Sequence, residues 1–142
     1  MAALFRSSVT ATKFARSFSV SAARSDLNKI QLIGRIGADP TVHEISENSK
    51  VVNYTVATSE TRPDKEGNLI KRTQWHRVSA WKGSDWIVEK VKKGDLVYVE
   101  GKLRYSDYTD REGIQRTKAE INQTTLKVLT QGRGHGEEEI EE

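Results

Sequence analysis

Residues 71–105, KRTQWHRVSAWKGSDWIVEKVKKGDLVYVEGKLRY, decide which fold the rest of the chain can adopt. Residues 71–81 have the two-residue alternation of a strand, and residues 95–105 alternate again, with valines on one face. Residues 84–93 between them have the marks of a short helix: a Ser that can cap the start, an Asp in the first turn, Lys in the last and Gly to end it. The stretch predicts a strand, a helix and a strand in succession.

Further strands are predicted on both sides of this stretch. Residues 29–36 are rich in Ile and Leu, residues 50–59 alternate, and residues 115–129 form a weakly patterned last strand. Two polar hairpin loops, at 63–68 and 109–113, join neighbouring strands. Five strands with one short helix between the third and fourth indicate an all-β protein of the OB-fold class, a five-stranded, partly open Greek-key barrel. A small β-sandwich is the alternative.

The composition of the chain argues against several classes of function. The chain has 142 residues, of which 35% are hydrophobic, so it has room for one domain with a small core. It contains no Cys, its three His residues are scattered, and it lacks the phosphate-loop, nucleophile-elbow and zinc-protease motifs. No apolar run approaches the ~18 residues of a membrane span. We therefore expect a protein that is not an enzyme, uses no cofactor or metal, and does not enter a membrane.

Charge is segregated along the chain and predicts three parts. Residues 1–24 carry four basic side chains and no acid, and are rich in Ser and Ala, which is typical of a mitochondrial transit peptide. The alternative for this leader is a basic arm that binds nucleic acid. Residues 25–131 form the predicted OB-fold domain. Residues 132–142 form a flexible, Gly-rich, acidic tail, which either keeps the protein soluble or competes weakly with phosphate.

The strand at residues 73–81 has an unusual face. Period-two alternation places Trp75, Arg77 and Trp81 on one side, together with Thr73 and Ser79. Two indoles beside a guanidinium suit the stacking of unpaired bases, with Arg77 free for a phosphate or cation–π contact. The alternative is that both indoles are core residues and Arg77 belongs to a rim ion pair.

Other residues extend this surface. Tyr108, at the second hairpin, can either stack on a base or pack against the protein. A groove of basic side chains that follows a nucleic-acid backbone is predicted from Lys71, Arg72, Lys82, Lys93, Arg104, Arg111 and Arg116. Each of these alone is an ordinary surface charge, and only their coincidence with the aromatic strand favours a binding groove.

Several segments together resemble one known family. They are LNKIQLIGRIG at 27–37 followed by Asp39-Pro40, ATSE at 57–60, TQWHRV at 73–78, KGDLVYVEGKL at 93–103, and YTD at 108–110. In order and spacing the chain resembles bacterial-type single-stranded DNA-binding proteins over about residues 27–131. With the leader, this identifies it as a mitochondrial member of that family, from a fungus.

The resemblance implies an OB-fold homotetramer that wraps single-stranded DNA during replication and repair. It assigns stacking roles to Trp75, Trp81 and Tyr108 and a subunit-interface role to His76. Where bacterial members often place a further stacking Trp, this chain has Arg62, which implies a charge contact instead. Its acidic end also lacks the aromatic or Pro residues of a partner-recruiting tip, which argues against recruitment of a replication polymerase or helicase by that route.

The leading functional hypothesis is sequence-independent binding and protection of single-stranded DNA, in replication and maintenance of mitochondrial DNA, in the matrix nucleoid. One alternative is a single-stranded RNA-binding OB module, because stacking does not separate the two sugars. The other is an accessory OB subunit that binds protein. A charged, aromatic face argues against the second alternative, because the centres of protein interfaces are depleted of charge.

Overall fold

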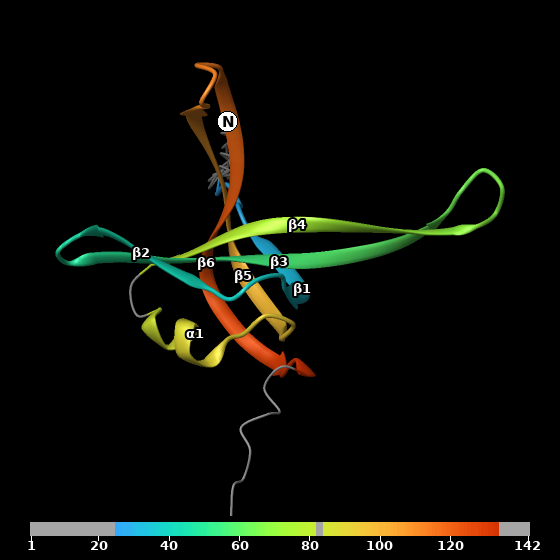
Figure 1. Cartoon of the computed structure of the whole chain (residues 1–142), viewed down its shortest axis with the longest axis horizontal. Coiled ribbons are helices and arrows are strands. Elements are labelled where there is room, and N and C mark those ends of the chain that lie inside the picture. The colour runs from blue at the N-terminus through green and yellow to red at the C-terminus, as the bar shows by residue number, and fades with distance from the viewer. Residues whose placement is uncertain (1–24, 82–83, 134–142) are drawn as a thin grey trace, which may run out of the picture.

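The structure is a computed structural model that describes residues 25–81 and 84–133. The predicted transit peptide (1–24), Lys82 and most of the predicted tail (134–142) lie outside the described residues. Within those residues the chain forms, in order, β1 (Ile30–Ile36), β2 (Thr41–Ser46), β3 (Ser49–Pro63), β4 (Leu69–Trp81), α1 (Asp85–Lys90), β5 (Leu96–Thr109) and β6 (Gln115–Thr130) (Figure 1).

Five of the strands pair in a ring. The order runs from β1 to β5, β6, β4 and β3, and β3 returns to β1. All of these pairings are antiparallel except that of β4 with β6, which is parallel and short. Helix α1 connects β4 to β5, which are the third and fourth strands of the ring in chain order. This is the strand and helix order that the sequence predicts.

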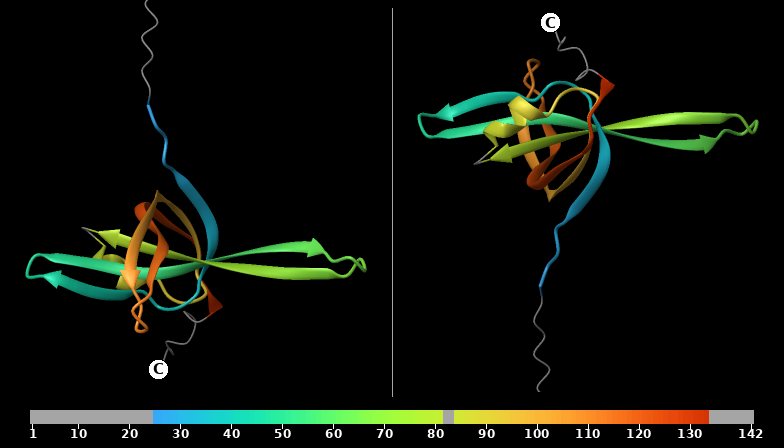
Figure 2. Two further views of the ribbon diagram at one scale, coloured as in Figure 1. Left: turned by 90° about the horizontal axis from the view of Figure 1, so that it is seen from above. Right: turned by 90° about the horizontal axis from the view of Figure 1, so that it is seen from below.

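The sixth strand, β2, was not predicted. It pairs only with β3, outside the ring, in a hairpin that projects from it (Figures 1 and 2). All six of its residues are exposed, so no alternation of apolar and polar side chains marks it as a strand.

The helix is shorter than predicted. It covers Asp85–Lys90, whereas the sequence pattern extended it over residues 84–93. Val91 already has extended backbone, and the next residues form the turn into β5. Ser84 does not cap the helix with its side chain, because its hydroxyl donates to the carbonyl of Ala80 at 3.2 Å instead.

The core lies inside the ring and is built mainly from valines. On β3 and β4, residues directly opposite each other, such as Val52 with Ala80 and Tyr54 with Val78, point inward together. The Tyr54 hydroxyl donates to Gln123, and burial raises the pKa of Tyr54. The remaining members of the core are Ile36, Val56, Ile87, Val91, Val97, Val99, Ile121 and Leu126.

One fully buried carboxylate joins three parts of the ring. Asp95, just before β5, accepts hydrogen bonds from the backbone N–H of Lys92 at 3.0 Å and of Gly132 at 2.7 Å. Its carbonyl accepts the N–H of Ile36 at 2.9 Å. The end of β1, the turn after α1 and the residues after β6 are therefore tied to one residue.

Beyond the ring, two pairs of strands continue as arms (Figures 1 and 2). We name them the β3–β4 arm (residues 58–74) and the β5–β6 arm (residues 104–120). Both end in the same turn, Asp-basic-Glu-Gly, at 64–67 and 110–113. In each turn the Asp carboxylate accepts the N–H groups two and four residues on, at 2.8 Å for Asp64 and 2.9 Å for Asp110. The Gly has a positive φ of 86° or 80°, which favours glycine. The predicted hairpin loops are thus confirmed.

A polar cluster covers the outer side of β1 and β5. Gln31 Nε2 donates to Tyr98 Oη and Glu100 Oε1, both at 3.0 Å, and Tyr98 donates to Glu100. Lys29 Nζ lies 3.3 Å from the same carboxylate. The hydrogen bond from Tyr98, then those from Gln31 and Lys29, lower the pKa of Glu100 from 4.5 to about 2.

We expect Tyr98→Phe to lower the free energy of unfolding at pH 7, because the ionised Glu100 then loses its strongest donor. A lowered carboxyl pKa contributes stability that is present above the unfolded pKa near 4.5 and is lost as the pH falls through about 2. The difference between wild type and variant should therefore shrink between pH 4.5 and pH 2, as measured by urea unfolding. A difference of equal size at pH 7 and pH 2 would show that the hydroxyl acts through its hydrogen bond from Gln31 and not through the ionised Glu100.

Candidate nucleic-acid interface

The two predicted indoles lie on the outer side of β4 and are exposed. Trp75 is 62% exposed and Trp81 is 43% exposed, so neither is a core residue in this chain. On β3, Ala57 lies opposite Trp75 and Val51 lies opposite Trp81. Arg77 lies between the two indoles on the same side and is exposed.

The position of Trp75 depends on a glycine. A Cβ placed on Gly37 would be 2.4 Å from the Trp75 ring and 2.8 Å from Thr55 Oγ1. The backbone of Gly37 is held there by its N–H, which donates to the carbonyl of Thr55 at 3.0 Å. Only a residue without a side chain allows the indole to lie this close to the loop after β1.

Between Arg77 and Trp81 the face is polar. Ser79, which is buried, lies opposite Asn53 of β3 and beside Asn122 of β6. Its hydroxyl donates to Glu120 Oε1. The side-chain oxygens of Asn53 and Asn122 are buried without a hydrogen-bond partner among the described residues. The floor between the aromatic residues is therefore polar, with buried side-chain oxygens of Asn53 and Asn122 and a carboxylate held by Ser79.

The roots of both arms meet at this floor. Trp75 stands where the β3–β4 arm leaves the ring, and Arg104 and Glu120 pair across the root of the β5–β6 arm. Trp81, Arg104 and Glu120 line one shallow hollow, and Trp75, Arg77 and Glu120 line another. The structure thus brings Trp75, Arg77, Trp81 and Arg104 together around one site, and their role in binding remains a prediction.

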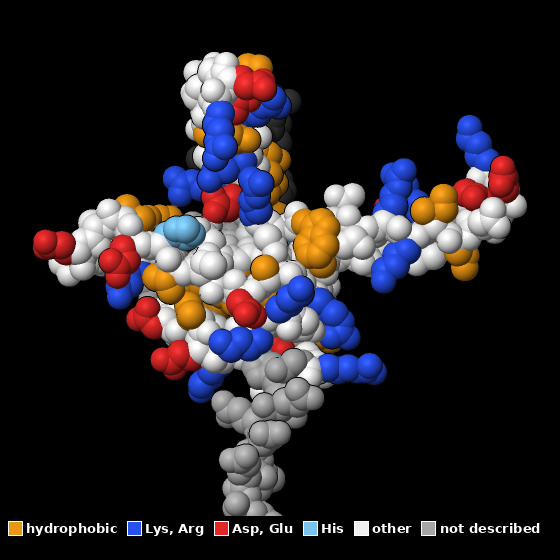
Figure 3. Space-filling model, in the orientation of Figure 1, with side chains coloured by type: hydrophobic (Ala, Val, Ile, Leu, Met, Phe, Trp, Pro, Cys, Tyr) orange, Lys and Arg blue, Asp and Glu red, His pale blue; other side chains and the backbone are white. Residues whose placement is uncertain are grey.

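Other predicted residues lie along the arms. Tyr108 is partly exposed on the β5–β6 arm opposite Arg116, which donates to Asp110 Oδ2 at 2.6 Å, and Arg111 is in the turn. Lys71, Arg72 and Arg62 lie on the β3–β4 arm, and Arg62 pairs with Glu60 at 3.2 Å. Figure 3 shows blue basic side chains along both arms, the upper and the right-hand one in that view.

Two predicted residues lie away from the centre of this face. Lys93 is in the turn after α1, where its N–H donates to Asp39 at 2.7 Å. His76 points to the inner side of β4 and is half-buried, with Nε2 2.8 Å from Thr58 Oγ1. The role of His76 between subunits remains a prediction.

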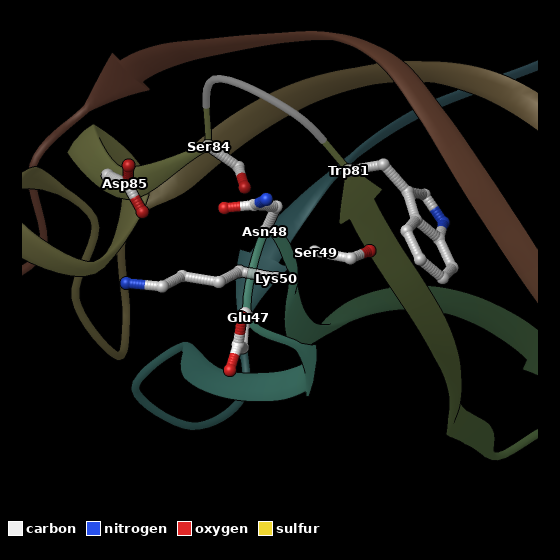
Figure 4. Close-up of a pocket in the computed structure, with 7 residues that line it drawn as sticks. All are labelled: Glu47, Asn48, Ser49, Lys50, Trp81, Ser84 and Asp85. Carbon is white, nitrogen blue, oxygen red and sulfur yellow. The ribbon is translucent and has the colours of Figure 1, made fainter.

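A larger hollow borders Trp81. It has a volume of about 600 Å³ and lies between the β2–β3 turn and the start of α1. Figure 4 shows Trp81 at one side, at the end of β4, and Lys50 extending across the hollow. Its remaining lining residues are Glu47, Asn48, Ser49, Ser84 and Asp85.

The sequence analysis missed Glu120, the two Asn residues and Tyr105. Tyr105 is 66% exposed, on the side of the β5–β6 arm opposite Arg104 and Tyr108. The sequence carries a signal for Glu120, because Lys118, Glu120 and Asn122 alternate with apolar residues on β6, although residues 115–129 as a whole are weakly patterned.

The described residues offer neither a metal-binding cluster nor a membrane-spanning helix. Residues 25–81 and 84–133 contain no group of three or more His, Cys, Asp or Glu side chains that could hold a metal ion. Across the same residues, no helix has the length and apolar character needed to cross a membrane.

We expect Gly37→Ala to displace the Trp75 indole toward solvent, because the new methyl group would occupy the position of the ring edge. An exposed ring can move, so the loss of stability should stay below the ~1–3 kcal/mol of overpacking in a closed core. In a Trp81→Phe, Trp86→Phe background, Trp75 fluorescence should shift to the red and be quenched faster by acrylamide. Unchanged emission and quenching would show that Gly37 does not position the ring.

Comparison with known proteins gives a consistent result. The model of the Single-strand binding protein family matches residues 27–129. The chain is 40% identical over 104 residues to the single-stranded DNA-binding protein of Neisseria meningitidis serogroup A, covering 72% of this chain and 60% of that protein. It is 32% identical over 113 residues to the mitochondrial single-stranded DNA-binding protein of Danio rerio, covering 74% and 77%. The match thus spans about 60% of the length of the Neisseria relative.

A solved structure, the Plasmodium falciparum SSB complex with ssDNA, is 30% identical, with a TM-score of 0.67, over 75% of this chain and 97% of that chain. This similarity confirms the predicted fold class. Because the family model also matches almost all of the described strands, the chain belongs to the single-strand binding protein family.

Proposed function

We propose that this chain binds and protects single-stranded DNA with little dependence on sequence. The observation that carries the proposal is the pair of exposed indoles, Trp75 and Trp81, with Arg77 between them on one face of β4. Every base has a flat aromatic surface, so stacking on these rings is tolerant of sequence, while basic side chains on the two arms attract the phosphates. The family and the DNA-bound structural relative support this role. The proposed role is binding, with no catalytic step.

We further propose that the protein acts in mitochondria, in the replication and maintenance of mitochondrial DNA. The basic, acid-free composition of residues 1–24 and the mitochondrial relative from Danio rerio support this location. In this proposal residues 1–24 are a transit peptide, residues 25–131 are the DNA-binding domain and residues 132–142 are an acidic tail. A fungal source and contact with a replication polymerase or helicase belong to the same proposal.

The proposed assembly is a homotetramer, which the family resemblance suggests. His76 supports it by its position, because it lies on the side of β4 opposite the indoles. His76 stands next to the point where the β3–β4 arm leaves the ring, so a subunit packed against that side of the arm would leave the DNA-binding face open.

We expect Trp75→Ala and Trp81→Ala each to weaken binding to oligo-dT by roughly 1–3 kcal/mol, the contribution of one stacked base. Trp86→Ala is the matched control, because this third indole lies on α1 and outside the aromatic face. Binding is measured by fluorescence anisotropy with oligo-dT, duplex DNA and oligo-U, and folding by circular dichroism.

If the two variants remain folded and bind oligo-dT like wild type, the stacking proposal is wrong. Preference for oligo-U over oligo-dT would favour the RNA-binding alternative. Affinity for oligo-dT should also fall with salt, with a log–log slope of about −0.7 for each phosphate neutralised.

We expect His76→Tyr to weaken subunit association at low micromolar concentration while each subunit stays folded, because the larger ring no longer fits the contact. Analytical ultracentrifugation measures the oligomer, and circular dichroism measures the fold. An oligomer unchanged in size and concentration dependence would remove His76 from the interface.

A further inference from the structure

The carboxylate of Glu120 lies in the middle of a face whose basic side chains attract phosphate. Glu120 lies on the outer side of β6, between the aromatic residues of β4 and the basic residues of both arms. It lines three hollows: one with Asn53, Arg77 and Lys118, one with Trp81 and Arg104, and a third with Trp75 that also reaches the inner-side residues His76 and Ile121. No other described residue lines all three. A base edge that enters the hollow between Trp81 and Arg104 therefore lies close to Glu120.

The two oxygens of Glu120 are used unequally. Oε1 accepts the hydroxyl of Ser79, which fixes the orientation of the carboxylate. Among residues 25–81 and 84–133, the ion-pair partner of Oε2 is the ammonium group of Lys118, at 3.9 Å, and the Glu120 side chain is 26% exposed. An ion pair this long between partly exposed groups contributes little. Oε2 therefore keeps lone pairs that are free to accept a hydrogen bond.

A carboxylate repels phosphate, so Arg77, Arg104 and Lys118 suit the DNA backbone and Glu120 does not. What Glu120 can bind is a hydrogen-bond donor. Cytosine, adenine and guanine each carry an exocyclic amino group, and acidic side chains accept hydrogen bonds from such a group on cytosine. Thymine has no amino group and presents carbonyl oxygens on both sides of its single N–H.

We propose that Glu120 reads base edges: its Oε2 accepts a hydrogen bond from the amino group of a stacked base and so disfavours thymine at that position. This rests on the proposed function of single-strand binding and refines it. Base preferences in such proteins generally come from stacking and backbone flexibility. Glu120 would add one hydrogen-bond contribution to an otherwise sequence-tolerant surface.

The test compares oligo-dC and oligo-dT of equal length at pH 8, where oligo-dC stays unfolded, for wild type, Glu120→Gln and Glu89→Gln. Gln keeps a carbonyl oxygen for Ser79 but loses the charge. Glu89, exposed on α1, controls for the loss of one negative charge. We expect the Kd ratio of dT to dC to fall about fivefold in Glu120→Gln, from the difference between a charged and a neutral hydrogen bond, and to stay unchanged in Glu89→Gln.

Uniform tightening for both oligonucleotides in Glu120→Gln would overturn the proposal and leave Glu120 as a general repulsive charge. Failure of wild type to bind either oligonucleotide would instead overturn the proposed function. If circular dichroism shows that Glu120→Gln is unfolded, the proposal is tested on the wild-type protein with a modified oligonucleotide. An oligonucleotide of 2-pyrimidinone, which is cytosine without its amino group, should then bind about fivefold more weakly than oligo-dC, and equal binding would refute the contact.

Discussion

The register of β3 against β4 is the constraint on which both the core and the binding face depend. Side chains alternate between the two sides of a strand, so the pairing that turns Val52, Tyr54 and Val78 inward also turns Trp75 and Trp81 outward. A slip of one residue would bury the indoles and Arg77 and would expose the valines. The aliphatic core therefore specifies the position of the aromatic face, even though no core residue takes part in it.

The parallel pairing of β4 with β6 determines where polar side chains from different strands meet on this face. It is short, with the partners Val78–Ile121 and Ser79–Asn122, and it lies where both arms leave the ring. Inside this junction Val78 and Ile121 are packed in the core, and outside it Ser79, Glu120 and Asn122 form a polar floor. A ring closed by so few pairs brings side chains from three strands within reach of one bound base.

Sequence reasoning succeeded where local patterns were strong. The alternation at residues 73–81 predicted the exposed face, and the two Asp-containing turns predicted both hairpins, because these features depend on neighbours in the chain. It missed β2, which has no buried residue, and the end of α1, where Val91 leaves the helix for the core. The polar floor could not be found in this way, since Glu120 and Ser79 are 41 residues apart and meet only through the β4–β6 pairing.

The matching turns at the ends of the two arms have a mechanical consequence. Each is closed by an Asp carboxylate that holds two backbone N–H groups, and each has a glycine where the chain reverses. Hairpins closed in this way lose less conformational entropy when a flexible polymer settles against them than open loops of equal length would lose. The turns of both arms are thus conformationally restricted before binding. Most of the conformational entropy lost when a complex forms is therefore lost by the bound single strand.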